Sequence, residues 1–153
     1  MIDRIKEFLG LGGGADRGRP GFELAAAALL VEAATLDGPM GKAERARILD
    51  LLAHRFTLTA EDSRALLAEA EKAAAASVQI LGFTRVIKDG TSPAERVRMI
   101  EMLWEVVYAD GHLDDYEANL IRRVTGLLFV SDHESGEARH RAMERLGLGG
   151  RTA

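Results

Sequence analysis

Residues 103–117 read LWEVVYADGHLDDYE, an apolar run that leads into an acidic turn and then into an acidic helix start. Residues 30–44 read LVEAATLDGPMGKAE and follow the same plan. The shared polar residues are 73 positions apart, in the pairs Glu32/Glu105, Asp37/Asp110, Gly38/Gly111 and Glu44/Glu117. Apolar residues keep the same spacing, in the pairs Leu30/Leu103, Ile48/Ile121 and Phe56/Phe129. One spacing at so many positions predicts an internal repeat of a helix–acidic turn–helix unit.

The composition is that of an ordinary globular domain. The chain has 153 residues, of which 47% are hydrophobic and 29% charged, with a net charge of −4. This length is sufficient for one domain with a real apolar core. A weakly acidic chain lacks the basic surface that binds phosphate backbones, so no nucleic-acid partner is expected. Cysteine is absent, which excludes disulfides, thiolate metal sites and cysteine nucleophiles.

Helix start signals recur along the chain, and no run of alternating β-branched residues competes with them. Ser92 with Pro93 and Glu95 is the clearest signal, an N-cap followed by proline and a capping glutamate. Thr59, Asp114 and Ser131 are predicted N-caps of the same kind. The sequence therefore predicts an all-α, single-domain bundle of seven to eight helices. Besides a short N-terminal helix, they cover about residues 22–36, 42–55, 60–76, 77–88, 93–110, 115–129 and 132–146.

Composition also divides the chain into three segments. Residues 1–21 combine a short amphipathic helix, expected to dock on its own domain, with a glycine-rich linker. Residues 22–148 form the helical domain, with the two repeats at about 24–76 and 94–146, and residues 149–153 form a disordered tail. No apolar run is long enough to span a bilayer, and no secretory signal is visible. A cytoplasmic location is therefore expected.

Two glutamates lie in nearly all-apolar helical surroundings, Glu32 in AALLVEAATL and Glu105 in MLWEVVYA. An isolated ionised carboxylate in such a place costs several kcal/mol, so each needs a partner or access to the surface. Asp37 and Asp110 are predicted at helix C-termini, where the helix dipole disfavours a negative charge. The partner is a backbone amide, a bound cation, or one of the arginines Arg45, Arg47, Arg122 and Arg123.

The residues leave two interpretations of these carboxylates open. In the first, they are helix caps and ion pairs. In the second, they bind a divalent cation such as Ca²⁺ or Mg²⁺, which prefers oxygen ligands, at one shared site or at two equivalent sites. The candidate metal ligands are Asp110, Glu117, Glu105, Asp37, Glu44 and Glu32. A hydrolase built on Glu105 and Glu117 is a third hypothesis, for which no substrate cleft is indicated.

The acidic turn at Tyr108–Glu117, echoed at Leu36–Glu44, resembles that of the TerB family of tellurite-resistance-associated proteins. The run Trp104–Tyr108 is similar to a bacterial branch of that family, and the resemblance covers about residues 24–146. It implies an all-helical fold without an established enzymatic reaction. It also implies a role in tellurite and other stress responses through partner proteins, in part at the membrane. The acidic turn residues of the family are implicated in divalent-cation binding. The resemblance therefore implies Asp37, Glu44, Asp110 and Glu117 as candidate ligands, with Glu32 and Glu105 as further candidates.

The first turn departs from the family pattern, because Gly41 and Lys42 stand where polar or acidic residues are expected. Lys42 is expected to weaken a cation site there or to pair with Glu44, so the second turn is the preferred site. The resulting hypothesis is a non-enzymatic, cytoplasmic, cation-binding stress-response module. The alternative is a purely structural protein–protein interaction domain, and whether the chain forms a homo-oligomer is left open.

Overall fold

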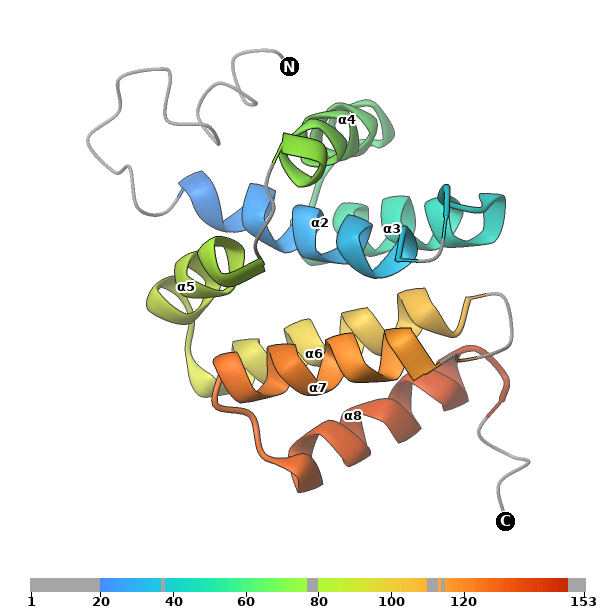
Figure 1. Ribbon diagram of the computed structural model, residues 1–153. Coiled ribbons are helices and arrows are strands. Elements are labelled where there is room, and N and C mark those ends of the chain that lie inside the picture. Colours follow the sequence, from blue (N-terminus) through green and yellow to red (C-terminus); the bar gives the residue numbers. More distant parts are fainter. Residues whose placement is uncertain (1–19, 37, 77–79, 110–112, 114, 149–153) are drawn as a thin grey trace.

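The computed structural model describes residues 20–36, 38–76, 80–109, 113 and 115–148, and this part of the chain is helical without any strand (Figure 1). The helices are α2 (Pro20–Ala34), α3 (Lys42–Arg55), α4 (Ala60–Ala76), α5 (Ile80–Gly90), α6 (Pro93–Val107), α7 (Asp115–Leu127) and α8 (Asp132–Arg145). The all-α prediction is confirmed. The predicted N-terminal helix and the linker lie outside the described residues, as does the C-terminal tail. No helix in the described part is long and apolar enough to cross a membrane.

Most predicted helix starts are present as capping interactions. The N–H of Ser92 donates to Glu95 Oε1 at 2.9 Å, and the Ser92 hydroxyl accepts from the Glu95 N–H. Ser131 makes the same reciprocal pair at the start of α8. The Thr59 hydroxyl accepts from an N–H in the first turn of α4. These local bonds satisfy N–H groups that the helix itself leaves unpaired, so they place the helix boundaries where the sequence predicts them.

Helix α2 is the central element of the fold. Nearly every residue from Ala25 to Ala34 is buried, with Glu32 as the half-buried exception. It packs against α3, α4, α5, α6 and, more weakly, α7. A helix that is apolar on all sides is stable only when other elements surround it. Helix α6 is comparably enclosed, because every residue from Met99 to Tyr108 is buried.

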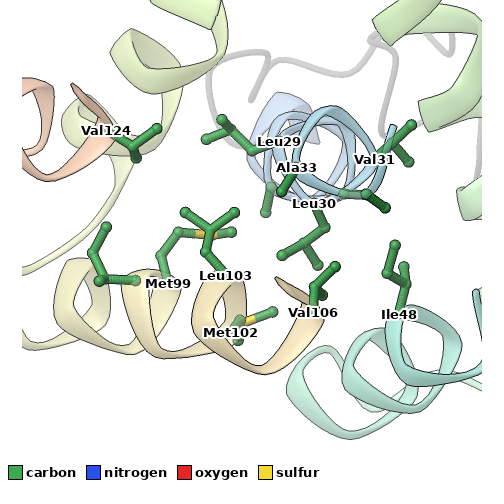
Figure 2. Close-up of a cluster of buried hydrophobic side chains, with 14 of the residues drawn as sticks. Leu29, Leu30, Val31, Ala33, Ile48, Met99, Met102, Leu103, Val106 and Val124 are labelled. Carbon is green, nitrogen blue, oxygen red and sulfur yellow. The ribbon is translucent and has the colours of Figure 1, made fainter. Parts of the chain in front are cut away.

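The core is centred where α2 faces α6. Leu29 and Leu30 of α2 lie toward Leu103 and Val106 of α6, and Ile48 of α3 closes one side of this cluster (Figure 2). All five side chains are fully buried. Burial of large aliphatic side chains supplies about 1.5–3 kcal/mol each, so this contact holds the two halves of the domain together.

The helix bounds follow the spacing found in the sequence, because α6 begins and ends 73 residues after α2. Equivalent positions differ in their packing, however. Phe56 is half-buried and meets Phe22 edge-on, with 5.6 Å between ring centroids. Phe129 is 74% exposed and lies under the ammonium group of Lys88. The halves thus share helix boundaries but not every contact, and the internal repeat stays a prediction.

Candidate functional site

The six carboxylates predicted as metal ligands lie in different environments. Asp37 and Asp110 lie outside the described residues, as does Asp114, the predicted N-cap of α7. In the first of the two acidic turns, Glu44 Oε1 accepts from the Gly41 N–H at 2.9 Å, so this glutamate caps α3. Glu117 is buried, with 6% exposure, in the first turn of α7. A carboxylate at this place is favoured by the positive end of the helix dipole.

Glu105 is almost fully buried, with 1% exposure, and is paired with arginines. Its Oε2 atom accepts a hydrogen bond from Nη1 of Arg145 at the end of α8. Its Oε1 atom lies 3.7 Å from Nη1 of Arg47 on α3. Arg47 is among the partners that the sequence suggested, whereas Arg145 is not.

A second buried carboxylate, Glu101, completes this charged cluster. Its Oε1 atom accepts from Nε of Arg141 at 2.8 Å, and its Oε2 atom accepts from Nη2 of Arg145. Arg145 therefore bridges Glu101 and Glu105. The arrangement follows from helix geometry, because two acids four residues apart on α6 face two arginines four residues apart on α8.

The arginines of α8 are consequently bound to groups on α6. Their spacing in the sequence predicts a solvated face or a contact for an acidic partner, and all three arginines are exposed while they also contact α6. Arg139 is also engaged, since its Nε donates to the Tyr108 hydroxyl at 2.9 Å and its guanidinium lies 5.4 Å from the Trp104 ring centroid. Attachment of α8 to α6 thus depends on polar and cation–π contacts as well as on apolar packing.

Burial and the arginines act on Glu101 in opposite directions. Burial, the largest single influence, raises the pKa of Glu101, but the hydrogen bonds and positive charges of Arg141 and Arg145 together hold it below its ordinary value. Glu101 therefore remains ionised at neutral pH. The cluster is a set of ion pairs, as the capping and salt-bridge interpretation expects for Glu105.

Glu32 has no such partner among the described residues. No cation or hydrogen-bond donor contacts its carboxylate within the described part of the chain, and burial raises the pKa of Glu32. Lys72, which stands 73 residues before Arg145, donates to Glu69 at 3.3 Å instead. The two apolar-helix glutamates that look alike in the sequence thus differ in their electrostatic environment.

The raised pKa predicts how Glu32→Gln affects stability. A glutamate whose pKa is raised by folding favours the folded state below its ordinary value of 4.5, and this contribution is lost as the pH rises through the folded-state pKa. At pH 7 the substitution should raise the free energy of unfolding by about 0.5 kcal/mol, while at pH 4 it should have no effect. Urea denaturation in EDTA at both pH values measures this. A destabilised variant at pH 7 would contradict it.

A cleft of about 520 Å³ opens beside the charged cluster, between α3, α6 and α8. We call it the arginine cleft, because its charged lining includes Arg47 and Arg55 of α3, Arg98 of α6 and Arg145 of α8. Glu101 and Glu105 line it from α6, and Leu51 and Met102 add apolar surface. Sequence reasoning missed this site. The residues 73 positions before Arg98 and Glu101 are Ala25 and Ala28. Because these two polar residues do not recur at the shared spacing, the repeat pattern did not point to them.

No group of three or more histidine, aspartate or glutamate side chains able to hold a metal is found among the described residues. Asp37, Asp110, His112 and Asp114 lie outside these residues. A cation site at either acidic turn therefore stays a prediction.

The chain is similar to a known protein family. The family model described as tellurite resistance protein TerB matches residues 23–140, which span α2 through most of α8. No match was found among curated proteins or among solved structures.

Proposed function

Because the chain belongs to the TerB family of tellurite resistance proteins, we propose that it is a non-enzymatic helical module of a tellurite-type stress response. In this proposal it takes up a divalent cation at the turn between α6 and α7 and acts in the cytoplasm through a partner protein. Asp110 and Glu117 are the ligands that the acidic turn offers.

The observation that carries the cation proposal is the burial of Glu117. This residue is 6% exposed in the first turn of α7, a few residues after Asp110 and Asp114 in the chain. Hard cations such as Ca²⁺ and Mg²⁺ bind carboxylate oxygens gathered near a turn. At the first acidic turn, Gly41 and Lys42 stand where polar or acidic residues are expected, and the positive charge of Lys42 disfavours a cation. This difference favours the second turn over the first.

The proposal predicts that Ca²⁺, Mg²⁺ or Mn²⁺ raises the melting temperature. A ligand at about 100 times its Kd stabilises the folded state by about 2.7 kcal/mol, or about 5–10 °C for a domain of this size. Asp110→Asn combined with Glu117→Gln should abolish the shift. Comparing each variant with and without the cation removes any effect of the substitutions on stability itself.

Two control variants sharpen this experiment. Asp115→Asn removes the same charge from an exposed neighbour in the same turn and should leave the cation shift unchanged. Asp37→Asn with Glu44→Gln tests the first turn and should change the shift little. The cation proposal fails if none of the three ions shifts the wild type, or if the Asp110/Glu117 variant responds as the wild type does.

A structural interaction domain is the second candidate, and specific contacts support it. Glu44 is bonded to a backbone N–H, and Glu101 and Glu105 are bonded to arginines of α8. In this alternative, the carboxylates hold helices in place and the surface alone serves the partner. Absence of any cation shift would favour this candidate over the first. The third hypothesis, a hydrolase built on Glu105 and Glu117, would require substrate turnover that is lost in Glu105→Gln.

A further inference from the structure

Three arginines of the arginine cleft, Arg47, Arg55 and Arg98, make no hydrogen bond to a carboxylate within the described part of the chain. Arg47 Nη1 lies 3.8 Å from Asp50 and 3.7 Å from Glu105, and Arg55 Nη2 lies 3.7 Å from Glu95. These separations are longer than hydrogen bonds. Arg98 has no carboxylate within ion-pair distance in the described part of the chain. By contrast, Arg141 and Arg145 are directly hydrogen-bonded to glutamates.

Helix geometry brings these three arginines to one space. Arg47 and Arg55 are eight residues apart on α3, and so lie near one face of that helix. Arg98 and Glu105 are seven residues apart on α6 and share a face in the same way. Helix α6 contacts α3 on one side and α8 on the other (Figure 1). The two faces therefore border the same cleft.

One glutamate of the cleft has an oxygen without a hydrogen bond in the described part of the chain, and Arg47 Nη1 lies 3.7 Å from it. Glu105 Oε1 is buried and accepts no hydrogen bond from any described residue, and Glu105 lines the cleft. A buried polar atom without a hydrogen bond costs about 1–3 kcal/mol. A bound molecule that donates to this oxygen would remove that cost. The cleft therefore offers guanidinium donors and a carboxylate acceptor to the same ligand.

We propose that the arginine cleft binds a phosphomonoester of a small hydroxylated metabolite. Its phosphate dianion is held by Arg47, Arg55 and Arg98, since a dianion calls for more than one guanidinium. A hydroxyl of the same molecule donates to Glu105 Oε1, while Leu51 and Met102 contact the carbon skeleton. The volume of about 520 Å³ is in the range of small-molecule sites. An inorganic anion alone would leave Glu105 Oε1 unsatisfied.

Isothermal titration calorimetry with three probes tests this proposal, using ribose 5-phosphate, glucose 6-phosphate and glycerol 3-phosphate. At least one should bind saturably with a Kd below about 1 mM at physiological salt. Inorganic phosphate should bind at least about tenfold more weakly, and ribose should not bind. EDTA in the buffer keeps this result independent of any cation at the acidic turn.

Substitutions distinguish a specific binding site from nonspecific attraction to positive charge. Arg47→Gln and Arg98→Gln should each raise the Kd of the phosphomonoester by about tenfold. Arg64→Gln, on the exposed side of α4 and outside the cleft, should leave the Kd unchanged. Glu105→Gln should weaken binding of the phosphomonoester but not binding of inorganic phosphate. This difference distinguishes loss of the hydroxyl contact from loss of the fold.

Three results would overturn the proposal. The first is no saturable binding of any of the three phosphomonoesters. The second is equal affinity for inorganic phosphate and the esters, which indicates an adventitious ion only. The third is an equal loss of affinity in Arg64→Gln and Arg98→Gln, which indicates nonspecific attraction to positive charge.

Discussion

Replacing Leu103 with alanine is expected to lower the free energy of unfolding by about 3 kcal/mol. Leu103 is fully buried in α6, at the contact with α2 (Figure 2). Truncation removes apolar burial and leaves a cavity, because α2 is enclosed by several other helices and cannot move freely into the space. Urea denaturation gives the free energy directly, provided that the slope of the transition is unchanged.

Leu36→Ala is the matched control for this substitution. Leu36 follows the end of α2 and is 39% exposed, so its truncation should cost well under half as much. Leu30→Ala should resemble Leu103→Ala, because Leu30 is also fully buried and lies toward Leu103 (Figure 2). The two truncations should not be additive, since neighbours share one cavity. Similar costs at Leu36 and Leu103 would show that this contact is not the core.

Replacing Arg145 with alanine is expected to cost about 2 kcal/mol. Removing one partner of a buried ion pair costs about 3–5 kcal/mol when the other charge is stranded. The value is lower here because the Arg145 side chain is 49% exposed and Arg47 and Arg141 remain beside the carboxylates. Glu105, whose side chain is 2% exposed, would be the stranded charge. Urea denaturation at pH 7 measures the loss.

Removing the other partner of this ion pair should destabilise the protein less. Glu105→Gln leaves Arg145 with Glu101 and with solvent, so we expect a cost below about 1 kcal/mol. Adding Glu105→Gln to Arg145→Ala should recover part of the stability, because the stranded charge is removed. Arg64→Ala is the control, since Arg64 is exposed on α4. If Arg145→Ala costs no more than this control, the ion-pair cluster does not hold α8 to α6.

Local chemistry explains which helices could be predicted. Ser92 and Ser131 cap α6 and α8 as their sequence context indicates, and the helix α3 has the predicted bounds, Lys42–Arg55. Such signals act within a few residues, so they are visible in the sequence. The C-terminal ends are less well defined, because α7 ends at Leu127 where the sequence suggests about Phe129. Helix ends are sensitive to packing as well as to local signals.

The partners of the buried glutamates show the limit of sequence reasoning. The apolar surroundings of Glu32 and Glu105 indicate that each needs a partner, but the sequence does not say which. Arg145 pairs with Glu105 because α8 packs on α6, whereas Lys72 at the corresponding position pairs with Glu69. Glu101 was not singled out at all, although it is bonded to two arginines.

The sequence by itself determined the all-helical fold, the capped starts of α4, α6 and α8, and the membership of the TerB family, because these depend on local capping, apolar periodicity and recurring motifs. Only the tertiary structure decided which charges meet. Residues 40 positions apart, such as Glu105 and Arg145, are brought together by the packing of α6 against α8. The arginine cleft has the same origin, since it exists only where faces of α3, α6 and α8 border one space. Contacts between distant segments are set by how helices pack, and no local signal encodes them.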